Sequence, residues 1–493
     1  MNTFNIGNTR EVCWDNMLID KNDGISIKLH KPVRKNTVMT CNEEWEGFCC
    51  GYFDILKVGN TYRLYYGAGG QRGSIYPEDN VGDGGRWVCM AESLDGKTFT
   101  KPKLCKFTSK AGSKINNIIH LEERYIDNFT IFYDENPDCP PDAKYKALSM
   151  CPVKGDPWRP ESANLAYYTS PDGINFTGPK ALYVNGEFDS FNVFFWDKAT
   201  KQYFLYVRDE HEPKEKNDDT TADCENVGRH IHVYTSKDFN NWQSHGLIKF
   251  DDNKEDYQLY TNGVHKYYRS ENIFLGIITR YLDRKNHEYN FKHVGFDKRD
   301  RFDYIKELGR EGTALTDAVL MTSRDGFYFD RCDEVFMSPG IQNGINWIYG
   351  DCYIGYGFIE TESDYKGEPN EISLYSGLGY HTRPVDVVRY TLRLDGFFSW
   401  HADYCGGEVL TKPICFDGDK LSINFETSAM GHIRIKICDE NGCEIEGYDS
   451  NLVFGNSVDR MVDFEKDVSL LKGKNVRLKI EMKDAELYSF IFC

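Results

Sequence analysis

The sequence has no long hydrophobic run. Its 493 residues contain no uninterrupted apolar stretch of the roughly 18 to 20 residues that a membrane-spanning helix needs. Residues 1–7 also lack the basic segment, followed by an apolar stretch, that is typical of a secretory signal. These two absences predict a cytoplasmic protein with no membrane partner.

Positive charge is scarce relative to negative charge. The chain has 59 Lys and Arg residues against 77 Asp and Glu, which gives a formal net charge of −18 and an isoelectric point near 5.2. An acidic surface repels phosphate backbones and anionic lipid headgroups. Binding to nucleic acid or to a membrane surface is therefore not expected.

The 16 cysteines show no spacing that is typical of a metal site. The sequence contains no Cys-x-x-Cys pair and no Cys/His cluster, which are the arrangements that hold structural zinc. Without a secretory signal, we expect reduced thiols that pack as small apolar side chains. No metal and no cofactor are predicted.

Helix signals are also scarce, and only residues 467–472 show a modest one. Strand signals, in contrast, follow a repeat. The pattern Ser-x-Asp-(Gly/Phe)-x-x-(Phe/Trp) occurs four times, at residues 93–99, 170–176, 236–242 and 323–329. Asp bonds its own backbone two residues on, Gly accepts a positive φ, and the aromatic residue returns to a buried face. Each copy therefore predicts a tight turn between two strands.

Each of these turns belongs to a unit of two hairpins. A second strand pair lies upstream of each turn, in residues 61–66, 144–150, 202–207 and 273–279. Two hairpins make a four-stranded sheet, which is the unit of a β-propeller blade. Strand-like runs in residues 353–394 predict a fifth blade that lacks one strand, and we expect residues 25–29 to supply it. The prediction is a five-bladed propeller, with six blades as the alternative.

The pattern changes after about residue 402. Short alternating strands follow at close spacing, with residues 439–442 as a hairpin turn. These features predict a small β-sandwich. The predicted fold class is all-β, with a five-bladed β-propeller in residues 1–402 and a C-terminal β-sandwich in residues 403–493.

A propeller brings the starts of its innermost strands together around one axis. The predicted starts of the first three blades each carry a carboxylate: Glu46, Asp127 and Asp189. Glycoside cleavage needs a protonated acid for the leaving oxygen and a second, ionised carboxylate that activates water or attacks carbon. These three are the predicted catalytic residues, and the alternative is that each caps a turn or faces water. Cys49 and Cys50 lie near the same place, where a reactive thiol is a further alternative.

Aromatic and charged residues near the same strand ends indicate a sugar ligand. Aromatic rings stack on the C–H faces of sugars while neighbouring polar groups bind the hydroxyls. The predicted substrate-binding residues are Trp45, Arg208, Asp209, Tyr260, Asn262, Arg280, Asp317, Trp347, Asp351 and His381. Packing of the blades through aromatic side chains, and ion pairs between blades, are the alternative interpretations.

Taken together, these features resemble the furanosidase propellers of glycoside hydrolase families 32 and 43. More closely, residues 45–47, 145–148, 188–192, 259–262 and 484–490 resemble a bacterial group of family-32-like proteins. This resemblance covers nearly the whole chain and implies the propeller, the C-terminal β-sandwich and a carbohydrate substrate. The Asn-Asp-Pro-Asn, Arg-Asp-Pro and Glu-Cys motifs of family 32 are absent in those forms, so Glu46 and Asp189 would replace the family's residues.

The sequence therefore predicts a glycoside hydrolase that cleaves a short oligosaccharide or glycoside, such as a fructoside or an arabinoside. Two alternatives stay open. A phosphate-dependent glycoside phosphorylase, similar to family 130, would use Arg208 and Arg280 to hold phosphate. A non-catalytic propeller would only bind the sugar. A small carbohydrate is the expected partner in each case, and the oligomeric state is not predicted.

Overall fold

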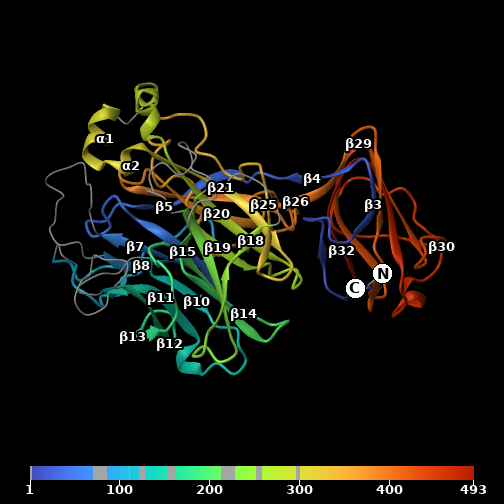
Figure 1. Ribbon diagram of the computed structural model, residues 1–493, viewed down its shortest axis with the longest axis horizontal. Helices are drawn as coiled ribbons and strands as arrows, with labels where there is room; N and C mark the ends of the chain where they lie inside the picture. Colours follow the sequence, from blue (N-terminus) through green and yellow to red (C-terminus); the bar gives the residue numbers. More distant parts are fainter. Residues whose placement is uncertain are drawn as a thin grey trace.

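The chain forms two lobes in the computed structural model (Figure 1), which describes residues 3–69, 86–109, 112–121, 128–152, 163–211, 228–250, 258–295 and 300–493. The larger lobe holds five small sheets around an axis. The smaller lobe contains strands from both ends of the chain, and both termini lie there. The lobes meet where β4 (Ile25–Leu29) pairs with β26 (Phe398–Ala402).

Each sheet of the larger lobe is a blade of at least four strands. From the innermost strand outward, blades 1 to 3 are β6 (Gly51–Val58), β7 (Thr61–Gly69), β8 (Arg86–Ser93) and β9 (Ile118–Leu121); β10 (Thr130–Tyr133), β11 (Tyr145–Pro152), β12 (Ala163–Ser170) and β13 (Thr177–Leu182); and β14 (Val193–Asp197), β15 (Gln202–His211), β16 (Gly228–Ser236) and β17 (Gln243–Leu247). Blade 4 is β19 (Gln258–Lys266), β20 (Phe274–Asp283), β21 (Ala314–Ser323), β22 (Tyr328–Arg331) and β18 (Lys249–Phe250), and blade 5 is β23 (Ile359–Thr361), β24 (Glu371–Leu378), β25 (Val385–Arg393) and β5 (Val33–Cys41). The predicted five-bladed, all-β propeller is confirmed.

The repeated Ser-x-Asp turns form as the sequence predicts. In the first copy, the Asp95 carboxylate accepts hydrogen bonds from the backbone N–H groups of Lys97 and Thr98, at 2.8 and 3.0 Å. Gly96 has a φ of +70°, and a Cβ there would lie 2.8 Å from a side chain of the neighbouring blade. The same backbone hydrogen bonds recur at Asp172, Asp238 and Asp325. The chemistry of these turns is local, so the sequence pattern is sufficient to specify them.

The strand that closes the ring differs from the prediction. Strand β5 (Val33–Cys41) pairs antiparallel with β25 and completes blade 5. Residues 25–29 instead form β4, which pairs with β26 in the smaller lobe. Both runs have buried apolar side chains, so the local pattern fits either position. Pro32 lies between the two strands, and the chain passes from one lobe to the other there.

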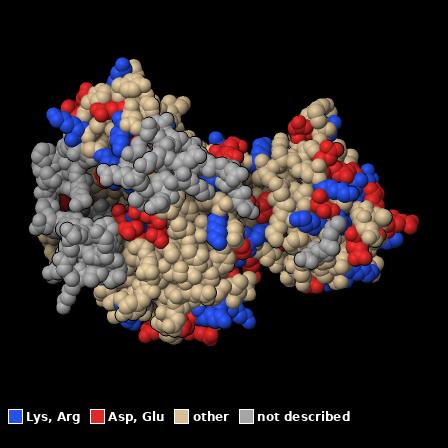
Figure 2. Space-filling model, viewed as in Figure 1, with Lys and Arg blue, Asp and Glu red and all other residues tan. Residues whose placement is uncertain are grey.

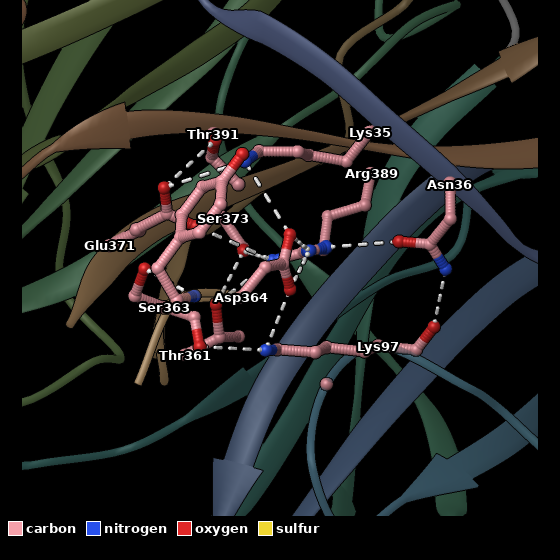
Figure 3. Close-up of polar contacts among 12 residues, drawn as sticks. Lys35, Asn36, Lys97, Thr361, Ser363, Asp364, Glu371, Ser373, Arg389 and Thr391 are labelled. Carbon is pink, nitrogen blue, oxygen red and sulfur yellow. Dashed lines mark hydrogen bonds and ion pairs between the residues drawn. The ribbon is translucent and has the colours of Figure 1, made fainter. Parts of the chain in front are cut away.

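A network of charged side chains joins the closing strand to blades 5 and 1 (Figure 3). Arg389 of β25 is buried and donates to both carboxylate oxygens of Asp364, at 3.0 and 2.9 Å. Lys97, from the first Ser-x-Asp turn, donates to the same carboxylate at 2.8 Å, and Lys35 of β5 lies 3.4 Å from it. The hydrogen bond from Lys97 and then the charges of the other two cations lower the pKa of Asp364 to about 2. One carboxylate therefore connects three separate segments of the ring.

Changing Asp364 to Asn should lower the free energy of unfolding by roughly 1 kcal/mol near neutral pH. The effect is small because the Asp364 side chain is 38 % exposed, and water screens its ion pairs. Since the folded state depresses the pKa of this carboxyl, its contribution should decrease as the pH falls from about 4 toward 2. Urea unfolding of both proteins near pH 7 and near pH 3 measures the change. An equal difference at the two pH values would contradict the ionic role.

The smaller lobe is built from strands at both ends of the chain. Its strands are β1 (Phe4–Gly7), β2 (Glu11–Val12), β3 (Ile19–Asp23), β4, β26, β27 (Gly407–Thr411), β28 (Ile414–Phe416), β29 (Leu421–Cys438), β30 (Glu444–Asp449), β31 (Asn456–Met461) and β32 (Arg477–Phe492). The central sheet has the order β3-β27-β32-β26-β4, and β29 pairs with β30, β31 and β32. Ile6 and Trp400 belong to one hydrophobic core with the long strands β29 and β32. The β-sandwich and the boundary at residue 402 stay predictions, and the strand pairing adds residues 4–29 to this lobe.

A helical insertion lies between β20 and β21 of blade 4. It contains the 3₁₀ segment η4 (Lys285–His293), α1 (Arg301–Leu308) and α2 (Arg310–Thr313), and it sits at one end of the propeller lobe (Figure 1). Asp300 caps α1 by accepting a hydrogen bond from the Phe302 backbone N–H at 2.8 Å. Two further 3₁₀ segments are η2 (Pro141–Ala143) and η5 (Val468–Leu471). Across the described ranges, no helix is long and apolar enough to cross a membrane.

Charges of both signs are interleaved on the face drawn in Figure 2. Acidic and basic side chains alternate across the smaller lobe, while much of the visible propeller surface carries neither. Among the residues that are coloured by charge, the acidic side chains therefore form no single broad patch on this face.

Candidate active site

The candidate site lies where the innermost strands of the blades begin. We call this end of the propeller the axial face; it comprises the residues that lead into the innermost strands and those that follow the second strand of each blade. Ten non-glycine residues of the described chain have a positive φ, and five of them lie at this face: Tyr52, Asn128, Trp347, Cys352 and His381. This conformation costs about 1–3 kcal/mol per residue, and such strain clusters at functional sites. Half of the positive-φ residues that are not glycine therefore lie at this one face.

Five tyrosines from blades 4 and 5, Tyr260, Tyr281, Tyr349, Tyr353 and Tyr380, form an aromatic surface that we call the tyrosine wall. The hydroxyl groups of Tyr260 and Tyr349 are hydrogen-bonded at 2.5 Å, and the rings of Tyr260 and Tyr281 stack with their centroids 5.3 Å apart. The Tyr353 ring lies 5.8 Å from Tyr260 and 6.3 Å from Tyr380. The first three side chains are buried, while Tyr353 and Tyr380 are partly exposed. The partly exposed rings of Tyr353 and Tyr380 are the faces of this wall on which a sugar can stack.

Two arginines that the sequence analysis missed lie against the tyrosine wall. The Arg229 guanidinium is 4.6 Å from the ring centre of Tyr281 and 5.1 Å from that of Tyr260. Arg310 of α2 donates to the Tyr281 hydroxyl at 2.9 Å. These contacts add cation–π attraction to the ring packing and hold the wall in place.

Asp189 is a predicted catalytic carboxylate that the structure leaves exposed. It precedes β14, and the next residue, Ser190, donates to the backbone carbonyl of Tyr260 at 2.8 Å. Burial raises the pKa of Tyr260, and the nearby negative charge of Asp189 raises it further. Asp189 thus lies beside the tyrosine wall and is open to solvent.

Asp127, the predicted carboxylate of blade 2, lies outside the described residues. Its neighbour in sequence, Asn128, donates to the backbone carbonyl of Phe188 at 2.6 Å. The start of blade 2 therefore contacts the segment that carries Asp189.

Glu46, the third predicted catalytic residue, lies in a closed environment. Its carboxylate has no exposed surface and accepts hydrogen bonds from the Tyr66 hydroxyl at 2.5 Å and from the Lys101 ammonium at 2.6 Å. The Glu43 backbone N–H donates to it as well, at 2.8 Å. A buried ion pair with these partners is structural, because the carboxylate has no surface through which it could meet a substrate. The environment of Glu46 gives no support to the predicted catalytic role.

Trp45 and Asn262 are enclosed as well. The indole N–H of Trp45 donates to Asn117 at 2.9 Å. The side-chain amide of Asn262 donates to the backbone carbonyls of Phe191 and Tyr206, at 3.2 and 3.1 Å. The Asn262 bonds join blades 4 and 3, so this residue holds neighbouring blades together.

The predicted arginines of blades 3 and 4 are paired with carboxylates. Arg280 and Asp317 face each other across β20 and β21 with two hydrogen bonds, at 2.9 and 2.6 Å. Arg208 donates to Glu210 at 2.8 Å and to the Glu187 backbone carbonyl at 3.0 Å. Both guanidinium groups thus already hold a negative partner.

Asp209 and Asp351 differ in their surroundings. Asp209 is partly exposed, and its carboxylate lies 2.8 Å from His232 Nδ1. Asp351 is 2 % exposed and accepts a hydrogen bond from the Ile348 backbone N–H at 3.0 Å. Burial raises the pKa of Asp351 to about 7. Asp209 is hydrogen-bonded to a histidine ring, whereas Asp351 is a buried carboxyl close to its titration point at neutral pH.

Trp347 lines a pocket of about 390 Å³ at the edge of the axial face. The lining includes Arg284, His287, Phe291, Leu315, Gln342 and Trp347. Aromatic side chains with a few polar groups are typical of a small-molecule pocket, and this volume lies in the usual range. A larger groove of about 950 Å³, lined in part by Trp14, Arg324 and Tyr328, lies at the outer edge of blade 4, away from the strand starts.

His381 packs against the tyrosine wall. It is 5 % exposed, and its ring lies 4.3 Å from Tyr380 and 6.1 Å from Tyr349 between centroids. Its backbone N–H donates to the Phe48 carbonyl at 2.8 Å, which ties the segment after β24 to the segment before β6. Of the predicted residues, the structure brings Asp189, Tyr260 and His381 to the wall.

Among the residues that the structure describes, no group of three or more His, Cys, Asp or Glu side chains is arranged to hold a metal ion.

Comparisons with known proteins find similar solved structures but no matching family model. No protein-family model matches the chain, and no curated protein matches it. Among solved structures, the chain is similar to a family 32 β-fructofuranosidase from Bombyx mori, with 11% identity, 94% of each chain covered and a TM-score of 0.38. It is also similar to the catalytic domain of a family 62 α-L-arabinofuranosidase from Coprinopsis cinerea, with 10% identity, 74% of this chain and 97% of the other covered, and a TM-score of 0.37. An endo-arabinase from Bacteroides thetaiotaomicron matches with 10% identity, 73% and 98% coverage and a TM-score of 0.38. These structures are glycoside hydrolases, and the sequence predicts a resemblance to that group of proteins.

Proposed function

We propose that the axial face binds a carbohydrate against the tyrosine wall and cleaves a glycosidic bond. The observation that carries this proposal is the exposed carboxyl of Asp189 beside a wall of packed tyrosines. The partly exposed rings of Tyr353 and Tyr380 supply the apolar faces on which a sugar stacks, and the carboxyl supplies the proton that a leaving oxygen needs. The pocket lined by Trp347, which lies two residues before Tyr349 in the chain, provides space for a further sugar ring.

Asp189 acts as the general acid in this proposal. A bound sugar displaces water from its carboxyl, and loss of water favours the neutral form of a carboxyl, which keeps a proton available for transfer. Asp127 is the proposed second carboxylate, which activates water or attacks carbon. The contact between Asn128 and Phe188 supports this pair, because it joins the segments that carry the two residues. The proposed substrate is a short oligosaccharide or glycoside, with furanosides such as fructosides and arabinosides first.

Phosphorolysis is the second candidate, and the structure weakens the basis for it. Arg208 and Arg280 are the expected phosphate ligands of a phosphorylase. Arg208 donates a hydrogen bond to Glu210 at 2.8 Å, and Arg280 donates two hydrogen bonds to Asp317. A phosphate would have to displace Glu210 or Asp317. We therefore place hydrolysis first.

Asp189→Asn should lower kcat/KM by at least ~100-fold on the best substrate, because the amide cannot donate the proton and keeps nearly the same shape. The substrate comes from a screen of aryl furanosides and pyranosides, with and without inorganic phosphate. Asp138, an exposed residue in the turn between β10 and β11, serves as the matched control, and Asp138→Asn should change kcat/KM by less than about twofold.

Near-normal turnover by Asp189→Asn on a verified substrate would remove Asp189 from the reaction. Calorimetry of sugar binding to the wild-type protein and to Asp189→Asn tests the third possibility, a non-catalytic propeller that only binds the sugar. A binding propeller would bind a sugar and turn over none of the glycosides screened, while strict dependence of turnover on phosphate would establish phosphorolysis.

A further inference from the structure

A thiol, an imidazole and a carboxylate lie in line at the axial face. Cys49 Sγ is 3.2 Å from His381 Nδ1, and Glu311 Oε2 is 3.4 Å from His381 Nε2. The three residues come from the segment before β6, the loop after β24 and the helix α2. The fold thus brings them together from blades 1, 5 and 4.

The imidazole of this group is held from several sides. His381 has a φ of +61°, and its backbone N–H is fixed by the Phe48 carbonyl, next to Cys49 in the chain. The rings of Tyr349 and Tyr380 pack on it. The strained backbone and the packed rings keep the ring nitrogens of His381 directed at the thiol and the carboxylate. Strain of this kind is typical of functional sites.

The geometry fits proton transfer and does not fit a metal site. The thiol and the carboxylate contact opposite nitrogens of one ring, so the three groups cannot converge on a single ion, and none of the described residues forms such a group. A carboxylate at Nε2 favours the tautomer with its proton on Nε2. Nδ1 then remains basic and can accept the thiol proton.

We propose that Cys49 is a nucleophile for acyl transfer, with His381 as its base and Glu311 as the positioning residue. The thiolate is the reactive form of cysteine, and a nucleophile, a base and an orienting carboxylate in line are the arrangement that acyl transfer uses. The substrate class is an ester carried on a carbohydrate hydroxyl. The carbohydrate part of this assignment rests on the proposed function, while the ester chemistry does not.

The steps balance without an oxidant or a reductant. The Cys49 proton passes to His381 Nδ1, the sulfur forms a bond to the acyl carbon, and the bond from that carbon to the sugar oxygen breaks. The imidazolium returns its proton to the released oxygen. Water then attacks the thioester, with His381 as the base, and releases a carboxylic acid and the free thiol.

The test uses 4-nitrophenyl acetate and the intact protein. This reagent contains no sugar, so the outcome is independent of glycoside cleavage. We expect a burst of about one nitrophenolate per protein and, by peptide mass spectrometry, an acetyl group on Cys49. Cys443, an exposed thiol in the smaller lobe, is the internal control, and Cys443→Ser should leave the burst unchanged.

Variants of the other two residues identify their roles. His381→Asn should lower the acylation rate of Cys49 at least ~100-fold, and Asn accepts the positive φ at this position. Glu311→Gln should shift the midpoint of the acylation pH profile to lower pH, because loss of the carboxylate lowers the pKa of the imidazole. Absence of acetyl on Cys49 in the wild-type protein, or an unchanged acylation rate in His381→Asn, would overturn the proposal.

Discussion

Replacing Asp395 by Ala is expected to lower the free energy of unfolding by about 3–5 kcal/mol. Its carboxylate has no exposed surface and accepts hydrogen bonds from Tyr267 at 2.7 Å and Arg269 at 2.8 Å. Ser489 of β32 donates to the same carboxylate at 2.7 Å, so one group joins the propeller to the smaller lobe. Burial alone would raise the pKa of Asp395, but the charges of Arg269 and Arg10 hold it below its ordinary value. Removal of the carboxylate leaves these cations without their partner at the junction.

The loss should persist in Asp395→Asn, which keeps the shape of the side chain and removes its charge. Asn also tolerates the φ of +60° that this position requires. Asp484, a partly exposed residue of β32 with a φ of +43°, is the matched control, and Asp484→Asn should change stability by less than about 0.5 kcal/mol. Guanidinium unfolding followed by tryptophan fluorescence measures all three variants. A loss below about 1 kcal/mol in both Asp395 variants would contradict the role of this carboxylate.

The blade count was predictable because the turns of the blades depend on local chemistry. Asp95 and its counterparts bind backbone groups two and three residues away, so a short pattern specifies each turn. The closing strand was not predictable in the same way. Residues 25–29 and residues 33–41 both contain a few apolar side chains that become buried, and their partners lie more than 300 residues away in sequence. Only long-range pairing decides which run joins the propeller.

The location of the site was predictable to the level of the axial face, but the orientation of its side chains was not. Glu46 and Asp189 both precede an innermost strand, yet Glu46 is enclosed by Lys101 and Tyr66 while Asp189 is exposed. The difference depends on Lys101, which is distant from Glu46 in the sequence and carries no pattern of its own. A sequence pattern shows which carboxylates lie near a strand start, and the surrounding partners decide which of them meets solvent.

The residues that the sequence analysis missed lie outside the repeated turn pattern. Glu311 and Arg310 lie in the helical insertion of blade 4, and Arg229 is the second residue of β16, before its repeated turn. For Glu311 alone the sequence offers an indirect signal. Cys49 is predicted near the axial face and His381 is a predicted binding residue, and in the structure His381 contacts both Cys49 and Glu311.

Asp351 should make stability depend on pH in the direction opposite to Asp364. Burial raises the pKa of Asp351 from an ordinary value of 3.8 to about 7. Between about pH 4 and pH 7, the folded protein therefore holds a proton on this carboxyl that the unfolded chain has lost. By linkage, the contribution of Asp351 to stability is greatest below about pH 4 and falls as the pH rises, by up to about 4 kcal/mol at pH 7. Above that pH both states are ionised, and no further change follows.

Asp351→Asn should remove this dependence, because an amide does not titrate. Relative to the wild-type protein, the variant is expected to gain up to about 4 kcal/mol of stability between about pH 4 and pH 8. The measurement is urea unfolding of both proteins at several pH values, and subtracting one curve from the other cancels the titration of all other groups. Parallel curves would show that the Asp351 carboxyl titrates as it does in the unfolded chain. In that case it would be ionised at neutral pH, and the substrate-binding role predicted for it from the sequence would regain a physical basis.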